Sequence, residues 1–224
     1  MTIFKNKTFS VISLDKDIGG ISKMIGYSSF VMSSEVKELN IFLFKKSQTY
    51  EFIFKKFNNK KNVFIHEISV FQRFLIKLGI IERKLNFILK KSDFIFIHNA
   101  NLIRSLSKFQ GAIPLFCFFH TDKLKQVKHF KNIDEVLAVN NYTKNFINNY
   151  YSNEKAHLLP NCINTKNIVN INFNRKNKKK MLVVGAMARL VEKKGINFLI
   201  DTLKEFPEIK LLIAGDGPLL NDFM

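Results

Sequence analysis

Short apolar segments alternate with helical patterns along this chain, and this alternation restricts the fold more than any other feature of the sequence. The rhythm is regular from residue 93 onward, with apolar segments at 93–97, 113–119, 135–139 and 157–159 around helical patterns at 100–108 and 142–151. Strands that are separated by helices pair in parallel through right-handed crossover connections. The pattern therefore predicts an α/β protein with a doubly wound, Rossmann-like sheet.

The sequence before residue 93 carries the same pattern in a weaker form. A strand is predicted at 9–14, and a turn and a helix at 21–32 follow it. Further strands are predicted at 40–44 and, from weaker patterns, at 50–54 and 63–65.

Residues 67–91 carry apolar side chains at a spacing that suits a helix. We expect Gly79 to split or bend this helix, because glycine costs about 1 kcal/mol relative to alanine in a helix interior. The basic residues of the segment would also suit a helix that lies on a membrane surface. We favour the alternative, a helix that packs on the core and has a solvated basic back.

The formal net charge of +18 is compatible with nucleic acid, an anionic membrane or a phosphorylated substrate as a partner. Lysine, asparagine, isoleucine and phenylalanine are all abundant and tryptophan is absent, which indicates a compositional bias of the whole chain. No recognition motif and no platform of aromatic and basic residues for single strands stands out. We therefore do not expect nucleic acid as the partner.

Neither a membrane-spanning helix nor a secretory signal is expected. No apolar run approaches the roughly 20 residues that a spanning helix needs, and Asp15 interrupts the N-terminal apolar segment. Cys117 and Cys162 lack metal-ligand or redox spacing, and we expect both thiols to be reduced. The sequence predicts a soluble cytoplasmic protein without a metal site, and leaves peripheral contact with the inner membrane face open.

A change of composition divides the chain. Residues 164–180 are polar and aperiodic, and predict a linker between a first domain at 1–163 and a second at 181–224. The second domain begins with a strand, a helix at 195–206 and another strand, which form a βαβ unit. A doubly wound domain needs on the order of 100 residues, so we expect this one to be incomplete and marginally stable by itself, with an uncovered sheet face.

The most specific motif lies in this last part. It reads Leu-Val-Val-Gly-Ala-Met-Ala-Arg-Leu from Leu182, then Lys-Gly at the start of a helix, then Ile-Ala-Gly-Asp-Gly-Pro after the next strand. In this order the elements resemble the opening of the donor domain in family 4 glycosyltransferases, which have the GT-B fold of two Rossmann-like domains. The resemblance implies a retaining hexosyltransferase type of enzyme that needs no metal or other cofactor, the nucleotide-sugar donor being a substrate.

The resemblance assigns Arg189 and Lys194 to the donor diphosphate. Negative charge grows on the nucleoside diphosphate as the glycosidic bond breaks, and fixed positive groups stabilise that transition state. Arginine offers a planar fork for phosphate oxygens and lysine a compact charge, and both residues precede a helix N-terminus that favours anions. The alternative is a pair of solvated basic residues. In the turn from Gly215 to Pro218 we expect the glycines to serve backbone geometry and Asp216 to cap or orient the turn.

Three positions in the first half follow from the same resemblance. Gly19 and Gly20 would let backbone N–H groups approach the donor phosphate or the acceptor, and a simple tight turn is the alternative. His120 ends a strand, where ligands of open α/β sheets bind, and the family commonly has a histidine there that contacts the transferring sugar. His120 is thus the catalytic candidate, with a strand-end histidine bonded to backbone as the alternative. His98 is a weaker candidate of the same kind.

Two further family motifs are matched with departures. Asn140 stands where the family usually has serine, and can still cap the following helix. In the segment that is usually Pro-Asn-Gly-Ile-Asp, Asn161 matches, whereas Cys162 and Asn164 replace glycine and aspartate.

The resemblance covers nearly the whole chain and is specific from Leu158 onward. It implies transfer of a sugar from a nucleotide-sugar to a lipid-linked or surface-polysaccharide acceptor. A pair of glutamates that binds the donor sugar and ribose in the family has no counterpart here, which puts activity in doubt. Two alternatives stay open: a truncated, inactive remnant or acceptor-binding module, and a split enzyme that a second polypeptide completes.

Overall fold

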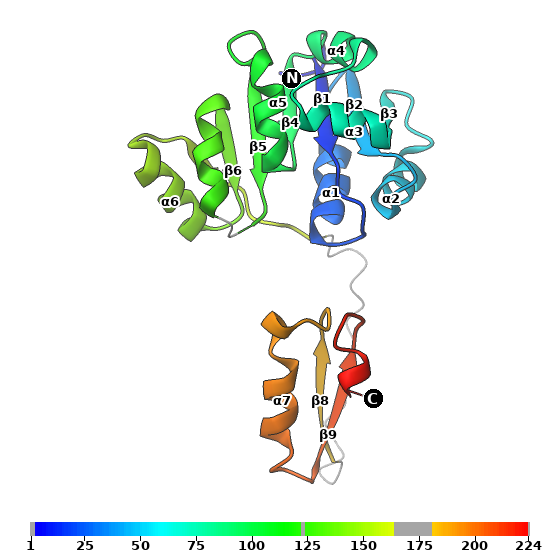
Figure 1. Ribbon diagram of the computed structural model, residues 1–224. Helices are drawn as coiled ribbons and strands as arrows, with labels where there is room; N and C mark the ends of the chain where they lie inside the picture. Colours follow the sequence, from blue (N-terminus) through cyan, green and yellow to red (C-terminus); the bar gives the residue numbers. More distant parts are fainter. Residues whose placement is uncertain (1–2, 122–123, 164–180, 224) are drawn as a thin grey trace. The chain divides into compact units, whose positions relative to one another are not determined.

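The computed structural model describes residues 3–121, 124–163 and 181–223. The chain divides into two compact units, Met1–Lys166 and Asn167–Met224, and each is described here by itself (Figure 1). The predicted linker at 164–180 lies outside the described residues.

The first unit is built on a seven-stranded sheet with the order β3-β2-β1-β4-β5-β6-β7, and every pairing is parallel. Its strands are β1 (Thr8–Ser13), β2 (Glu38–Phe44), β3 (Val63–Ile68), β4 (Phe94–Ile97), β5 (Leu115–Phe119), β6 (Glu135–Ala138) and β7 (Ala156–Leu158). The chain runs outward from β1 to β3 and then returns to the other side of β1 for β4. This reversal between β1 and β4 is the switch point at which open α/β sheets bind ligands.

Helices cover both faces of this sheet (Figure 1). They are α1 (Gly20–Glu35), α2 (Gln48–Phe57), α3 (Val70–Lys77), α4 (Arg83–Lys90), α5 (Ile103–Leu106) and α6 (Asn141–Tyr151), with 3₁₀ turns at Ala100–Leu102, Ser107–Phe109 and Leu124–Asn132. Side chains of successive strand residues point to opposite faces. In β1, Val11 therefore packs with α1 and α2, whereas Ile12 packs with α3 to α6. The predicted doubly wound Rossmann-like domain is confirmed.

The prediction of a weak strand at 50–54 is wrong, because these residues form the middle of α2. The Oγ of Ser47 accepts a hydrogen bond from the Tyr50 amide at 3.0 Å and caps the helix. Thr49, Ile53 and Phe57 are buried, a spacing of four residues that places them on one helix face. Short apolar stretches fit a strand or a buried helix equally well, and here the capping serine decides.

The helix expected at 67–91 is split at Gly79, as predicted. Gly79 has a φ of +84° and follows α3, and the Ile80 amide donates back to the Leu75 carbonyl at 2.9 Å. The preference for a core-packing helix is only partly right. Leu85 and Leu89 of α4 are buried, whereas Phe71 and Leu78 are 67% and 60% exposed.

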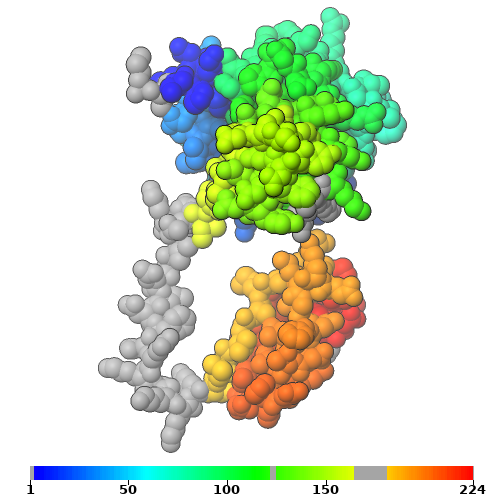
Figure 2. Space-filling model, turned by 90° about the vertical axis from the view of Figure 1, so that its left-hand side faces the viewer, coloured from blue at the N-terminus to red at the C-terminus, as the bar shows by residue number. Residues whose placement is uncertain are grey.

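In the space-filling view, α6 lies at the outer surface of the first unit as a yellow-green region (Figure 2). Asn140 caps this helix, since its side-chain oxygen accepts a hydrogen bond from the Thr143 amide at 2.8 Å. The departure from serine at this position therefore leaves the helix cap intact.

The second unit contains a parallel pair of strands, β8 (Leu182–Met187) and β9 (Ile209–Ala214). A 3₁₀ turn at Glu192–Lys194 and helix α7 (Ile196–Leu203) connect them, so the helix is shorter than the predicted 195–206. Among the described hydrophobic residues of this unit, Leu190 and Ile196 alone are buried. Exposed apolar side chains include Leu182, Val183, Met187, Phe198 and Leu212. The uncovered sheet face that the sequence predicts is therefore present in this unit.

Candidate functional site

The carboxyl ends of the strands around the switch point carry a cluster of polar side chains. His98 follows β4, His120 follows β5, and Asn99 lies next to His98. Along β4 and β5, residues of one parity face α1. His98 continues the parity of Phe96, and His120 that of Phe118. Both histidines therefore belong to the face of the sheet that α1 covers.

The two histidines are hydrogen-bonded to each other. The Nδ1 of His98 lies 2.9 Å from the Nε2 of His120, and the ring planes differ by 12°. His98 is 3% exposed, and its ring stacks on Phe118 with centroids 4.3 Å apart. His98, the weaker candidate from the sequence, is thus the direct partner of His120.

Both imidazoles are neutral near pH 7. Burial lowers the pKa of His98 well below its ordinary value, and the neighbouring His120 acts in the same direction. Burial also lowers the pKa of His120, although Asp15 and the side chain of Asn161 oppose this. The Nε2 of His98 and the Nδ1 of His120 are buried, and neither makes a hydrogen bond within the described part of the chain.

Asn99 connects the loops that follow β1 and β4. Its side-chain oxygen accepts hydrogen bonds from the Leu14 amide at 2.6 Å and from the Ser13 hydroxyl at 3.3 Å. The Ser13 hydroxyl also lies 3.1 Å from a carboxylate oxygen of Asp15. Asn99 is not among the site residues that the sequence predicts, although a polar residue directly after a buried strand is typical of a ligand site in an open α/β sheet.

Gly19 and Gly20 lie where the resemblance places them, before and at the start of α1. Gly19 is extended, with φ −160°, and neither glycine has a positive φ. A β carbon on either residue would meet no atom within 4 Å. The backbone therefore does not require glycine, and the missing side chains leave open space at the helix N-terminus.

A cavity of about 250 Å³ lies beside the histidine pair and the start of α1. It is lined by Ile21, His98, Asn99, Ala100, Asn101, Phe118, Phe119, His120, Thr121 and Gln126. Ile21 directly follows the two glycines, so the first turn of α1 and the histidine pair border the same space.

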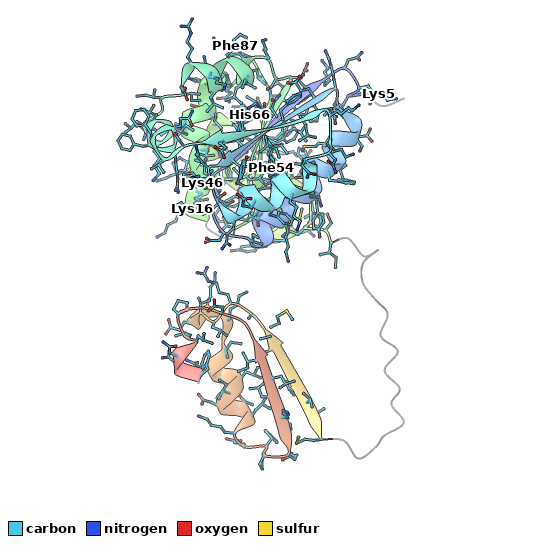
Figure 3. The ribbon with its side chains drawn as sticks, turned by 90° about the vertical axis from the view of Figure 1, so that its right-hand side faces the viewer. Lys5, Lys16, Lys46, Phe54, His66 and Phe87 are labelled. Atoms are coloured by element: carbon cyan, nitrogen blue, oxygen red, sulfur yellow. The ribbon has the colours of Figure 1, made fainter. Side chains whose placement is uncertain are left out.

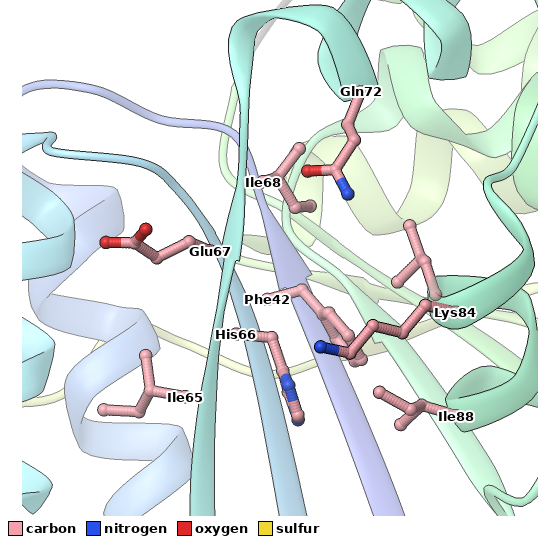
Figure 4. Close-up of a pocket in the computed structure, with 9 residues that line it drawn as sticks. Phe42, Ile65, His66, Glu67, Ile68, Gln72, Lys84 and Ile88 are labelled. Carbon is pink, nitrogen blue, oxygen red and sulfur yellow. The ribbon is translucent and has the colours of Figure 1, made fainter.

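A second cavity of about 280 Å³ lies along the edge strand β3, between this strand and α4. Figure 4 shows Lys84 of α4 and His66 of β3 directed toward the space beside Phe42, while Glu67 points to the other side of the strand. The Nε2 of His66 donates a hydrogen bond to the Oδ1 of Asn40 at 2.7 Å. Figure 3 views this edge of the unit, with His66 on the strand and Phe87 of α4 at the surface.

In the second unit, Arg189 and Lys194 lie between β8 and α7, as predicted, and both are exposed. Neither side chain makes an ion pair or hydrogen bond with another described residue. Gly195 has a φ of +66° and joins the 3₁₀ turn to the helix, a conformation that favours glycine. The geometry leaves both cations available to an anion.

Gly215 and Gly217 serve backbone geometry, as expected. A β carbon on either would collide with the backbone of Ala188 or Leu190. The Oδ1 of Asp216 accepts a hydrogen bond from the Gly217 amide at 2.7 Å, so Asp216 caps this turn.

Among the described residues, no three His, Cys, Asp or Glu side chains are grouped so that they could hold a metal ion. A membrane-crossing helix, judged by length and apolar character, is also absent from the part of the chain that the structure describes.

No protein family and no curated protein matches this sequence. Solved structures match over nearly the whole chain. Anabaena Alr3699/HepE, solved with UDP and glucose, is similar with a TM-score of 0.71 and 12% identity over 97% of this chain and 63% of its own. The lipopolysaccharide outer core galactosyltransferase WaaB has a TM-score of 0.63 and 16% identity, covering 96% of this chain and 62% of its own.

A putative UDP-N-acetylglucosamine 2-epimerase from Listeria monocytogenes is also similar, with a TM-score of 0.58 and 10% identity over 94% of this chain and 63% of its own. The fold is thus of the GT-B type, a Rossmann-like first domain and the start of a second. The chain spans 62% to 63% of the length of these three structures.

Proposed function

We propose that this chain supplies the acceptor-side domain and the diphosphate-binding start of the donor domain of a glycosyltransferase. The enzyme would move a sugar from a nucleotide-sugar to a lipid-linked or surface-polysaccharide acceptor. The observation that carries the proposal is the cavity at the switch point, which the first turn of α1 and the buried pair of His98 and His120 border. Ligands of open α/β sheets bind at this position.

The polar groups around the cavity suit a sugar better than an ion. Neutral imidazoles and the amides of Asn99 and Asn101 offer hydrogen bonds without net charge. His120 would contact the transferring sugar. Gly19 and Gly20 leave their helix N-terminus open to a phosphate or to the acceptor.

The cations of the second unit would act on the leaving group. Arg189 and Lys194 are exposed and unpaired among the described residues, so no internal partner has to be displaced. Their charge would stabilise the diphosphate as the glycosidic bond breaks. The reaction in this form requires no metal or other cofactor.

Calorimetry of the full chain with nucleoside diphosphates and nucleotide-sugars tests this proposal. We expect Arg189→Ala and Lys194→Ala each to weaken binding about tenfold or more, in line with the 1.5–3 kcal/mol of a charge-assisted hydrogen bond. Lys193→Ala is the matched control, because Lys193 is an exposed neighbour in the same 3₁₀ turn. Equal affinity in all variants would exclude the site assignment.

The second candidate function is a remnant or a module that binds an acceptor only. The incomplete cover of β8 and β9 favours it, and a chain of this kind binds no nucleotide-sugar in the same titration. A second polypeptide that covers this face would restore binding. Product analysis distinguishes a transferase from an epimerase. An epimerase converts the donor sugar without an acceptor, whereas a transferase consumes both the donor and the acceptor.

We also propose peripheral contact with an anionic membrane. It would use a surface on α3 and the following loop, which we call the α3 surface and which consists of Val70, Phe71, Phe74, Leu78 and Ile80. These five side chains are between 51% and 74% exposed. The net charge of +18 provides attraction to anionic lipid, which suits an enzyme with a lipid-linked acceptor.

A further inference from the structure

Two cations lie over the ring of Phe44 at the carboxyl end of β2. The ammonium of Lys16 is 4.9 Å from the ring centroid, and the guanidinium carbon of Arg73 is 5.0 Å from it. Lys16 belongs to the loop after β1, and Arg73 to α3, which follows β3. Figure 3 shows Lys16 at the end of the first unit away from Lys5, which precedes β1. The two charges therefore meet at the sheet edge where open α/β proteins bind ligands.

Neither cation has an acidic partner in the described part of the chain. The ion pairs found there involve other residues, and Glu67 near the end of β3 is paired with Lys45 at 3.3 Å. The Nε of Arg73 is buried and makes no hydrogen bond to a described residue. A buried donor without an acceptor is costly, and two like charges close to one ring repel each other. An anion that contacts both cations would remove both costs.

The loop that carries Lys16 is held in place by the start of α2. The Lys16 carbonyl accepts a hydrogen bond from the Thr49 amide at 3.2 Å, and the Thr49 hydroxyl donates to the Asp17 carbonyl at 3.0 Å. The Ile18 amide donates to the side-chain oxygen of Gln48 at 3.3 Å. The backbone of this loop is thus fixed before a ligand arrives, so binding has to order only the lysine side chain.

Arg73 comes from the helix that carries the α3 surface. Ile76, three residues further on, is 4% exposed, which places Arg73 toward the side of α3 that packs on the sheet. Val70 and Phe74 of the same helix are exposed. The helix therefore combines a guanidinium at the strand end with apolar side chains at the surface. This combination suits an amphipathic ligand with an anionic head.

The loop of Lys16 also leads to the cavity at the switch point. Burial lowers the pKa of His120, and Asp15, which precedes Lys16, is near enough to oppose this. Ile21, in the first turn of α1, lines the cavity. A ligand group at Lys16 is therefore close to the cavity in which the proposed function places the reacting sugar.

We propose that Lys16 and Arg73 bind the phosphate group of a lipid-linked acceptor. A phosphate group has several charged oxygens and can contact both cations, whereas a carboxylate carries a single charge. The lipid part would lie on the α3 surface, and the sugar part would reach the cavity. This assignment rests on the proposed function and narrows its acceptor to one that is linked through phosphate.

A ³¹P NMR titration of the full chain with hexyl phosphate tests the proposal. We expect Lys16→Ala and Arg73→Gln each to raise the Kd about tenfold, because each removes a charge-assisted contact. Lys60→Ala should keep the Kd of the unsubstituted protein. It is the matched control, since the Lys60 ammonium lies 5.2 Å from the ring of Phe30 and precedes the amino end of β3. Equal Kd values in all four proteins would overturn the proposal.

Two further ligands separate a lipid phosphate from other sources of phosphate. Inorganic phosphate should bind more weakly than hexyl phosphate, because it has no apolar part, and equal affinity would overturn the lipid assignment. UDP should bind Lys16→Ala and Arg73→Gln as well as it binds the unsubstituted protein. A loss of UDP affinity would assign the two cations to the donor and overturn their role at the acceptor.

The same titrations distinguish a failure of this inference from a failure of the proposed function. Nucleotide-sugar binding together with equal hexyl phosphate binding in all variants would refute the role of Lys16 and Arg73 alone. Hexyl phosphate binding that depends on both residues, in a chain that binds no nucleotide-sugar, would refute the proposed transfer and support the phosphate site.

Discussion

The carbonyl oxygen of Ala188 lies 1.9 Å from the position that a β carbon on Gly215 would take, closer than two such atoms can approach. The loop after β8 and the turn after β9 are thereby held against each other. The Leu190 amide donates to the Asp216 carbonyl at 2.8 Å, and the Leu219 amide donates to the Leu190 carbonyl at 3.2 Å. The loop that carries Arg189 is therefore positioned by a glycine in the turn after the neighbouring strand.

Gly215→Ala should disturb the second unit, because the backbone at Ala188 has to move to admit the methyl group. Overpacking of this kind typically costs about 1–3 kcal/mol. Amide hydrogen exchange of β8 and β9 in the full chain should accelerate, and nucleotide affinity should fall with it. Gly185→Ala is the control, since a β carbon there meets nothing within 4 Å. Equal exchange in the two variants would contradict the packing argument.

The second unit should be less stable than the first even without substitution. Its strands β8 and β9 each pair with one partner among the described residues, and Met187 is 89% exposed. Regions with few buried apolar contacts open at low free energy. Amides of 182–187 and 209–214 should exchange with deuterium much faster than those of the central strand β1. Strong protection of both segments in the isolated chain would exclude this prediction.

Asp93 stabilises the amino ends of β1 and β4. Its carboxylate accepts hydrogen bonds from the Thr8 amide and from the Lys7 ammonium, each at 2.8 Å. Burial raises the pKa of Asp93, but these hydrogen bonds outweigh it and the pKa is lowered. Asp93→Ala should reduce the free energy of unfolding by about 1–3 kcal/mol, because the Thr8 amide loses its acceptor.

Lys7→Ala separates the two contributions of Asp93. It removes only a partly exposed ion pair, which is worth about 0–1 kcal/mol. Urea unfolding of both variants at neutral pH measures the difference. A loss in Lys7→Ala as large as that in Asp93→Ala would show that the amide hydrogen bond contributes little.

The sequence predicted the doubly wound class of the first unit and most of its strands, whereas the order of the strands in the sheet comes from the structure alone. Buried parallel strands are continuous apolar runs, and these are readable at 93–97 and 113–119. The weak strand at 50–54 failed because a short apolar run also fits a buried helix, and the capping role of Ser47 was not recognised.

The sequence predicted single residues of the candidate site, but not the contacts between them. His120 was selected by its place at a strand end, but its partner His98 is 22 residues away in the chain. Their meeting depends on the register of β4 and β5, in which Ile97 pairs with Cys117. Register depends on tertiary packing, so the sequence alone offered two separate strand-end histidines. The same holds for Gly215 and Ala188, whose contact follows from the pairing of β8 with β9.

The α3 surface should bind anionic membranes. Phe71→Ser and Phe74→Ser remove apolar area that is exposed in the free protein, so stability should change by less than about 0.5 kcal/mol. Sedimentation with vesicles of phosphatidylglycerol should fall in both variants, and vesicles of phosphatidylcholine should bind little of any form. Phe54→Ser is the control, because Phe54 is a 47% exposed phenylalanine on α2. Unchanged sedimentation of the two α3 variants would exclude this surface.

Acid should destabilise the first unit through its buried histidines. The pKa of His98 is well below 6.5 in the folded protein and near 6.5 when unfolded, with burial as the main cause and His120 as the second. Below pH 6.5 the unfolded chain therefore binds more protons, and stability falls as the pH decreases toward the folded pKa.

Each unit of pKa difference corresponds to about 1.4 kcal/mol, and the lowered pKa values of His66 and His120 act in the same direction. Urea midpoints measured at pH 7.5 and pH 5.5 should differ less in His98→Asn than in the unsubstituted protein, because asparagine does not titrate. An identical pH dependence in the two proteins would mean that His98 is not held neutral by its burial.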